Sequence, residues 1–369
     1  METSITKNLC LFALLLISFE EARAQSSVTL FGVVDAGLMY QNQNGGTGLG
    51  GKTKDSVTMF TGAGGSDSSE FGMQGLEDLG GGTQVGFKLA NGFNSGNGAL
   101  GTAGTLFNQE SNVFFQSQYG RVTVGKQLDP AYLAVVFSDP RDAKNAYSAV
   151  GTWNFLQGND PAPSDTVYES NAISYSYRDR GASAGVLYRF GGIPGALSQG
   201  RVISAGVGYD NGSLIGNGGF LTKNDSSGTR DLRVWEIGLG YRIESVTIKA
   251  LYVDYDLPLG NVVAPIGTTP PSHVIEAGGG VNWRLSPAQE ITVAYYFTEN
   301  KMDTTNATSM YVLSDDYSLS KRTKLYGYVG LMSAKKGANA LTALTTAQLT
   351  TGYPNANTST IGFGIQHTF

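Results

Sequence analysis

The chain has 369 residues, of which 51 are glycine, 19 tyrosine and 17 phenylalanine, only one is cysteine, and the formal net charge is −5. This weak acidity argues against a nucleic-acid partner, and a single cysteine excludes an intramolecular disulfide framework. No apolar stretch long enough for a membrane helix follows the N-terminal region. The composition favours a glycine-rich and aromatic-rich β protein.

The first 24 residues have the pattern of a secretory signal peptide. Lys7 gives a short positive region, residues 9–17 are apolar, and Ala22-Arg23-Ala24 matches an A-x-A cleavage site. The apolar run is too short to span a bilayer, and the alternative is a short buried helix. We expect cleavage after residue 24, with residues 25–369 forming one domain and Cys10 lost with the signal.

Segments of about ten residues with alternating polarity fill the rest of the chain, the length that a tilted membrane strand needs. In residues 28–40, Val34 and Leu38 share one face and Asp35 lies on the other. The last segment again alternates and ends on the aromatic Phe369. The predicted strands are 28–40, 69–77, 84–94, 106–118, 121–127, 167–177, 182–190, 201–209, 213–222, 230–243, 246–256, 274–286, 290–299, 308–319, 322–333 and 359–369.

The connections between these segments alternate between short and long. Turn-forming residues fill short connections such as 77–83 and 286–289, whereas 41–56, 128–166, 257–273 and 334–358 are long. Sorting of loops by parity is typical of an outer-membrane barrel, which has short turns at one end and long loops at the other. We therefore predict an all-β fold, a 16-stranded antiparallel transmembrane β-barrel.

Five landmarks then resemble the general Gram-negative porins, in the form common among beta-subdivision bacteria. They are residues 27–37, 77–82, 122–127, 317–326 and 367–369, and they occur in the family's order along nearly the whole mature chain. The resemblance implies a homotrimer in the lipid bilayer of the outer membrane that lets ions and small hydrophilic solutes diffuse passively. It also implies that the third long loop, residues 128–166, folds inward and narrows the barrel.

The sequence departs from this family where the family carries basic residues. Glu70, Gln74, Gln109 and Tyr168 stand at such positions. The third long loop is acidic, because its charged residues are Asp129, Asp139, Asp142, Asp160 and Asp165 against Arg141 and Lys144. Fixed charges in a narrow pore attract counterions. These substitutions predict a weak preference for cations, or near neutrality, unless they reflect only a differently packed loop.

The predicted pore-lining residues combine this loop with the polar faces of the strands. They are Asp35, Glu70, Gln74, Lys88, Lys126, Asp129, Asp139, Asp142, Tyr168, Arg189, Arg242 and Arg284.

Other motifs give weaker hypotheses. Residues 46–51 match the dinucleotide-binding pattern G-x-G-x-x-G, but no helical pattern follows them. Neither His273 nor His367 lies where a catalytic pair or a metal site would need a histidine. The acidic pair Asp315-Asp316 could bind a divalent cation but is more simply a solvated pair. We predict no enzymatic activity and no cofactor. Two alternative functions remain, a substrate-specific porin and a closed barrel that displays its loops as an adhesin or receptor.

Overall fold

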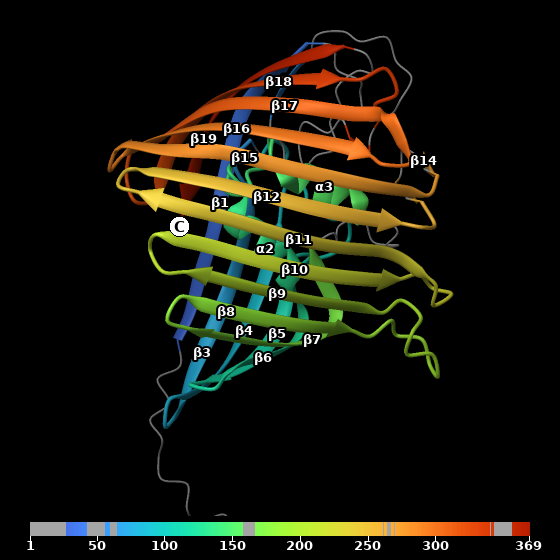
Figure 1. Ribbon diagram of the computed structural model, residues 1–369. Coiled ribbons are helices and arrows are strands. Elements are labelled where there is room, and N and C mark those ends of the chain that lie inside the picture. Colours follow the sequence, from blue (N-terminus) through green and yellow to red (C-terminus); the bar gives the residue numbers. More distant parts are fainter. Residues whose placement is uncertain are drawn as a thin grey trace, which may run out of the picture.

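Each long strand pairs antiparallel with its neighbours, and the first strand also pairs with the last, so that the sheet closes on itself (Figure 1). The computed structural model describes residues 27–42, 56–59, 65–157, 167–260, 262–263, 267–268, 270–339, 341–342 and 356–369. The predicted signal peptide, the glycine motif at 46–51 and the loop residues Asp160 and Asp165 lie outside these residues.

Sixteen long strands form the wall within the described chain, which confirms the predicted barrel. They are β1 (Ser27–Gln41), β3 (Glu70–Gly80), β4 (Thr83–Gly92), β5 (Glu110–Ser117), β6 (Gly120–Leu128), β7 (Tyr168–Asp179), β8 (Ala182–Arg189), β9 (Val202–Asp210), β10 (Leu214–Asn224), β11 (Arg230–Ile243), β12 (Val246–Leu257), β15 (Ser272–Ser286), β16 (Gln289–Asn300), β17 (Asp303–Ser318), β18 (Thr323–Ala334) and β19 (Asn357–Thr368). The short β2 (Ser56–Met59) lies beside β1, and β13 (Val262–Val263) pairs with β14 (Gly267–Thr268).

Most predicted boundaries lie within three residues of the observed ones, and two differ by more for local reasons. The segment predicted to start at residue 106 becomes a strand only at Glu110, because Phe107 has a φ of 59° and therefore leaves the extended region. The segment predicted to start at 308 begins already at Asp303, where it pairs with Asn300 across a tight turn.

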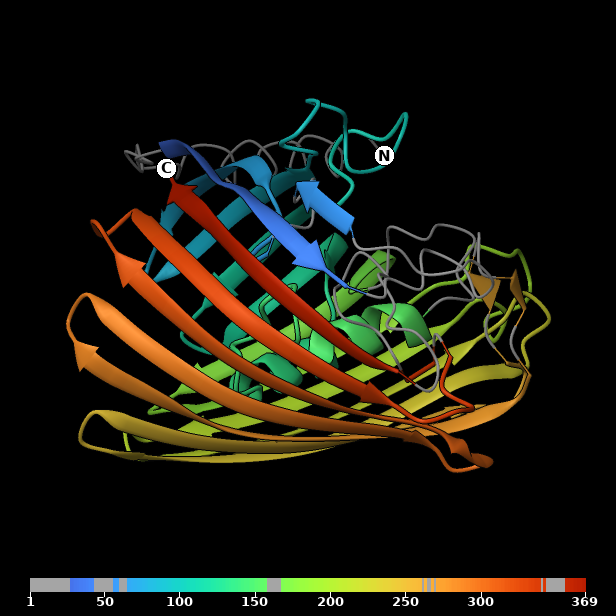
Figure 2. The same ribbon diagram turned by 90° about the horizontal axis from the view of Figure 1, so that it is seen from above.

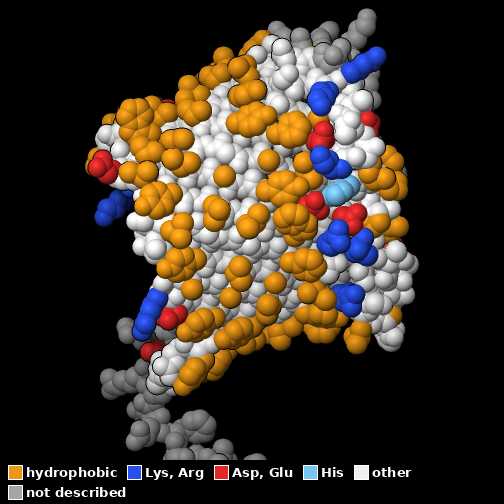
Figure 3. All heavy atoms as spheres, in the orientation of Figure 1, with side chains coloured by type: hydrophobic (Ala, Val, Ile, Leu, Met, Phe, Trp, Pro, Cys, Tyr) orange, Lys and Arg blue, Asp and Glu red, His pale blue; other side chains and the backbone are white. Residues whose placement is uncertain are grey.

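The outer surface of the barrel is apolar between two charged ends. On β11, Trp235, Ile237 and Tyr241 are exposed, whereas Glu236 between them is buried. Figure 3 shows hydrophobic side chains scattered over the middle of this face and charged side chains gathered towards its ends. This arrangement exposes apolar side chains to lipid and keeps charged side chains near the aqueous phases on either side of the membrane, as a membrane barrel requires. Among the described helices, none has the length and hydropathy of a membrane-spanning helix.

The loop after β6 lies inside the barrel, as the family resemblance implies. Its described part, residues 129–157, is called the inward loop below and contains α2 (Pro130–Ser138) and α3 (Ala149–Leu156). α2 packs on the inner faces of β9, β10 and β11, and α3 reaches β15 (Figures 1 and 2). The core therefore lies between the inward loop and one half of the wall, where Trp153 of α3 meets the ring of Tyr255 edge-on.

Candidate functional site: a channel narrowed by the inward loop

Glycines on the inner face of the wall allow the inward loop to lie directly on the sheet. This glycine track consists of Gly206, Gly238, Gly280 and Gly330. A Cβ atom on Gly206 would lie 2.1 Å from the carbonyl oxygen of Pro130, and one on Gly330 would lie 2.3 Å from the ring of Tyr147. Real side chains cannot occupy such positions, so the loop is seated where the wall lacks side chains.

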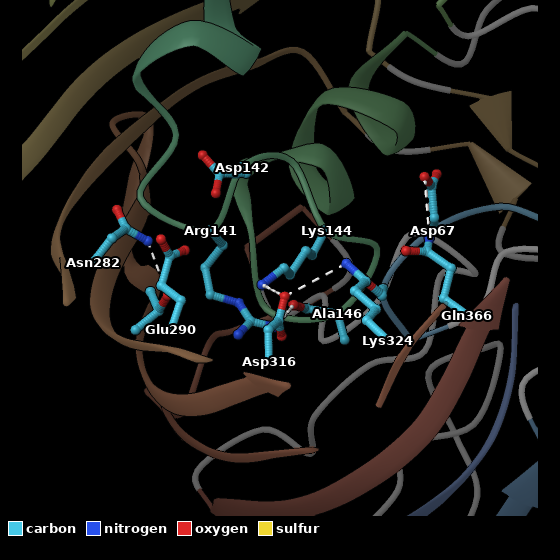
Figure 4. A network of polar contacts seen from close by, with 12 residues as sticks. Asp67, Arg141, Asp142, Lys144, Ala146, Asn282, Glu290, Asp316, Lys324 and Gln366 are labelled. Carbon is cyan, nitrogen blue, oxygen red and sulfur yellow. Dashed lines mark hydrogen bonds and ion pairs between the residues drawn. The ribbon is translucent and has the colours of Figure 1, made fainter. Parts of the chain in front are cut away.

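Hydrogen bonds and an ion pair fasten the loop to the same half of the barrel. The Tyr147 hydroxyl and the Thr360 hydroxyl on β19 are 2.6 Å apart. Figure 4 shows Lys144 and Arg141 reaching from the loop towards Asp316 on β17, and the Lys144 ammonium lies 2.7 Å from this carboxylate. Burial lowers the pKa of Lys144, and Asp316 opposes this effect. The main contacts of α2 are with β8–β12 and those of α3 with β15. The space between the loop and the inner faces of β3–β7 is called the aperture below.

The buried carboxylates of the loop shape its backbone and do not face the aperture. Asp129 is fully buried, caps α2 by accepting the Ala131 N–H at 2.8 Å, and accepts the Ser204 hydroxyl. Burial, followed by the nearby Glu169, raises the pKa of Asp129 to about 7. Removal from water thus outweighs the hydrogen bonds that favour the ionised form.

Asp139, at the C-terminus of α2, stabilises the turn that follows the helix. Its carboxylate accepts the Arg141 N–H at 2.9 Å and also the hydroxyl of Tyr296 on β16. Burial again raises the pKa of this group. Asp142 differs, because its side chain is 49% exposed and forms an ion pair with Lys249 on β12. The interpretation that these three aspartates project negative charge into the aperture is therefore wrong for Asp129 and Asp139.

Asp35 lies on the lumen face of β1 but is covered by the segment 65–69. Its carboxylate accepts the Tyr326 hydroxyl at 2.5 Å and the backbone N–H groups of Asp67 and Ser66 at 2.8 and 3.3 Å. The Ser66 carbonyl in turn accepts the N–H of Asn145 in the inward loop at 3.2 Å. Asp35, with no exposed surface, thus connects β1, β18, this segment and the loop, and does not line the open channel.

The free wall of the aperture carries charges of both signs. Lys88 on β4 stands opposite the exposed Gln74 of β3, pairs with Glu110 of β5 and lies 5.2 Å from the centre of the Phe31 ring. Glu70 lies on the same lumen face of β3, four residues before Gln74 and therefore nearer to the long-loop end of the barrel. The positive and negative groups on this wall therefore largely offset one another.

A cavity of about 960 Å³ lies between α2 and the inner faces of β4–β9. The short turns after β3, β5 and β7 lie around its outer end, and α2 forms its inner side. This vestibule cavity continues the aperture towards the short-turn end of the barrel. A closed barrel, an apolar outer face and an inward loop beside a polar wall together describe an aqueous passage through a membrane.

Comparison with known families decides the assignment. The family model described as Gram-negative porin matches residues 13–337. The chain belongs to this porin family. An outer membrane porin of Bordetella pertussis is 27% identical over 402 residues, covering 98% of this chain and 100% of that protein. Outer membrane porin protein 32 of Delftia acidovorans is 29% identical, covering 94% of this chain and 95% of the relative.

Solved structures support the same fold. The anion-selective porin from Comamonas acidovorans has a TM-score of 0.76 and 26% identity, and the match covers 94% of this chain and 100% of that one. The trimer form of OmpT from Vibrio cholerae has a TM-score of 0.65 at 12% identity, covering 93% and 99%, which shows the fold alone. This porin is accordingly an outer-membrane protein, and its relatives are channels.

The remaining predicted pore residues of this porin lie apart from one another. Arg189 on β8 pairs with Glu169 at 2.9 Å, and Arg242 on β11 makes two hydrogen bonds to Asp210 at 2.7 and 2.9 Å. Arg284 on β15 has a side chain that is 69% exposed, and its guanidinium lies 3.9 Å from the Glu290 carboxylate.

Of the two other predicted pore residues, one lies near the aperture and one faces outwards. Tyr168, the first residue of β7, is half-buried within electrostatic reach of Glu70 and Glu110, which places it near the aperture. Lys126 departs from the prediction. It stands opposite Ser111 in the row that contains the exposed Val124, and this row faces outwards. Lys126 is two residues after Val124, so strand alternation alone places its side chain on the same outer face.

Sequence reasoning missed other lumen groups. Arg121 on β6 stands opposite Gln116 on the lumen face, and its guanidinium lies 3.5 Å from the centre of the Phe114 ring. Strand parity alone would have found Arg121. Strand parity would also have placed Asp315 and Asp316 on opposite faces of β17, because adjacent strand residues point in opposite directions. Of these two aspartates, it is Asp316 that reaches Lys144.

The raised pKa of Asp129 predicts a pH dependence of loop anchorage. The folded protein holds this proton above the usual pKa of 3.8, so the contribution to folding stability is full below about pH 4 and is lost as the pH rises through about 7. Stability against urea at pH 5 should therefore exceed that at pH 8. In Asp129→Asn the difference should shrink, because asparagine caps a helix equally well without titrating. An unchanged difference in this variant would assign the pH dependence to other groups.

Proposed function

We propose that this porin is a general diffusion channel that lets ions and small hydrophilic solutes cross the outer membrane, and that it works as a homotrimer. The observation that carries the proposal is the aperture between the inward loop and a polar, charge-balanced wall, continued by the vestibule cavity. Such a passage favours hydrated solutes because its wall offers hydrogen-bond partners along the path. The trimer form of the neighbour from Vibrio cholerae supports the oligomeric state.

The competing function is a barrel that only displays its long loops. A display barrel has no need for an aperture beside the inward loop, and it should not conduct. Planar-bilayer recording of the purified mature protein separates the two: the proposal expects stepwise current increases in KCl and swelling of vesicles in small sugars. A protein that inserts, as shown by protease protection, and yet gives neither result would support the display function. Chemical cross-linking in detergent tests the trimer.

For ion preference we propose a channel that is near neutral or weakly cation-preferring. Asp129 and Asp139 contribute little to this preference because they are buried. The proposal is supported instead by the wall, where the Lys88–Glu110 pair cancels and Glu70 and Gln74 stand at lumen positions. The similar Comamonas acidovorans porin is described as anion-selective, so the zero-current potential in a KCl gradient is a sharp test. A strongly anion-selective value would contradict the proposal.

Replacing Lys88 by glutamine should shift this potential towards cation selectivity. The substitution leaves the Glu110 carboxylate without its cation next to Glu70, so the aperture gains net negative charge. The shift should be clear at low ionic strength and shrink in concentrated salt, since the Debye length falls from about 10 Å at 0.1 M to about 3 Å at 1 M. Arg284→Gln is the matched control, because Arg284 is largely exposed on the other half of the wall. Equal shifts in both variants would mean that the aperture does not set the preference.

A further inference from the structure

The side of α2 that faces the vestibule cavity is apolar, although it lies within a water-filled channel. No residue of α2 is charged, and Leu133 is 46% exposed beside Val136 and Phe137. The residues of α2 that are buried on the wall are Ala131, Ala134, Val135 and Ser138. A helix that needed only to narrow a hydrophilic channel would not gain from the exposed Leu133 or from the half-buried Val136 and Phe137, because apolar surface left in water costs free energy.

The wall opposite α2 carries two arginines among polar side chains. Arg121 donates through Nε to the Thr123 hydroxyl at 3.2 Å, and Arg178 is exposed near the turn after β7. Among the described residues, no carboxylate lies within ion-pair distance of either guanidinium. Glu110 also lines the cavity; it pairs with Lys88 and attracts the Arg121 guanidinium without coming within ion-pair distance of it. Each guanidinium therefore retains donors for an anion from the channel.

The two sides of the cavity complement one kind of solute. We propose that the vestibule cavity is a binding subsite for small organic anions with an apolar body, such as aromatic carboxylates. The carboxylate is held by Arg121 and Arg178, and the ring or branched chain packs on Leu133, Val136 and Phe137. The volume of about 960 Å³ is within the range of small-molecule sites and exceeds that of one such solute.

This subsite rests on the proposed function and narrows its solute class. Binding is weak, because a solute in a channel must also leave it. The subsite lies on the periplasmic side of the aperture. The cavity is lined by residues at the short turns, including Gly82, Gln118 and Gly120, and short turns face the periplasm in outer-membrane barrels. Anions therefore meet it after passing the aperture on the way in.

Block of the KCl current by added solutes tests the proposal. Benzoate is the probe, acetate lacks the apolar body, benzamide lacks the charge, and benzylammonium reverses it. We expect saturable block by benzoate only, at lower concentration when it is added on the short-turn side. Equal block by acetate or by benzamide at the same concentration would overturn the proposal, as would block without saturation.

Variants separate the two sides of the subsite. Arg121→Gln should raise the half-blocking concentration of benzoate roughly tenfold, the size of one lost charged hydrogen bond. Phe137→Ser should raise it a few-fold and leave acetate unaffected. Arg242→Gln is the matched control, because Arg242 is a lumen arginine that does not line this cavity, and its half-blocking concentration should equal that of the unmodified protein.

The exposed Arg178 provides a second variant if Arg121→Gln fails to fold, since the Arg121 guanidinium also stacks on Phe114. Arg178→Gln should weaken block in the same direction, and unchanged block in this variant and in Phe137→Ser would overturn the subsite. A protein that inserts but shows no current steps would overturn the proposed function itself. Current steps with no saturable benzoate block would overturn only the subsite.

Discussion

Replacing Asp35 by alanine should cost this porin about 3 kcal/mol of folding stability and make its single-channel current larger and noisier. The carboxylate receives the hydroxyl of Tyr326 and the N–H groups of Asp67 and Ser66, and all of these would lose their acceptor in a place closed to water. Ser66 would then hold Asn145 less firmly, so the inward loop would move more freely at this end. Urea titration followed by tryptophan fluorescence and planar-bilayer recording measure the two effects.

Asp315→Ala is the control for this experiment. Asp315 is a strand carboxylate too, but it is exposed, and among the described residues it accepts hydrogen bonds only from Gln289, at 3.2 and 2.9 Å. Its loss should change stability by less than about 1 kcal/mol and leave the current unchanged. If the Asp35 and Asp315 variants lose similar stability, Asp35 has no special place in holding the segment 65–69.

Strand parity explains why most of the barrel was predictable from the sequence. A strand with one face to lipid and one to water has apolar residues at every second position, as Trp235, Ile237 and Tyr241 show on β11. The same rule correctly turns Asp35 inwards. It does not tell that residues 65–69 cover Asp35, because that depends on contacts between segments distant in the chain.

The inward loop shows where the sequence was insufficient. Counting its carboxylates suggested a negative lining. Asp129 instead caps α2 and accepts the Ser204 hydroxyl, and Asp139 accepts the Arg141 N–H in the turn after α2 and the Tyr296 hydroxyl. A loop has no fixed period, so no pattern assigns its side chains to water or to protein. Only the tertiary contacts decide it, and they convert two apparent pore charges into structural ones.

Four glycines of the barrel wall have a specific structural role. Glycines are spaced along the lumen face where the loop crosses the strands, at Gly206, Gly238, Gly280 and Gly330. Each omits a side chain that would otherwise hold the loop away from the sheet. The width of the channel therefore depends on how closely the loop can approach the wall behind it. It depends also on the residues that line the aperture.

Gly330→Val tests this directly and should narrow the channel. The new side chain would occupy the site of the Tyr147 ring, whose atoms lie 2.3 to 2.6 Å from a Cβ placed there. Tyr147 would leave the wall, lose its contact with Thr360 and move the loop towards the aperture. We expect smaller current steps, with a loss of stability of about 1–3 kcal/mol from overpacking.

Two further variants make the result specific to the loop seat. Gly327→Val lies on the same strand, but the nearest atom to its Cβ is a backbone oxygen at 3.7 Å, so conductance should not change. In the double variant Gly330→Val with Tyr147→Ala the ring that clashes is gone, and the current steps should recover towards the original size. Such non-additivity is expected only for residues in contact. Steps that stay small in the double variant would mean that Gly330 acts through the barrel wall and not through the loop, because the clash with Tyr147 would no longer exist.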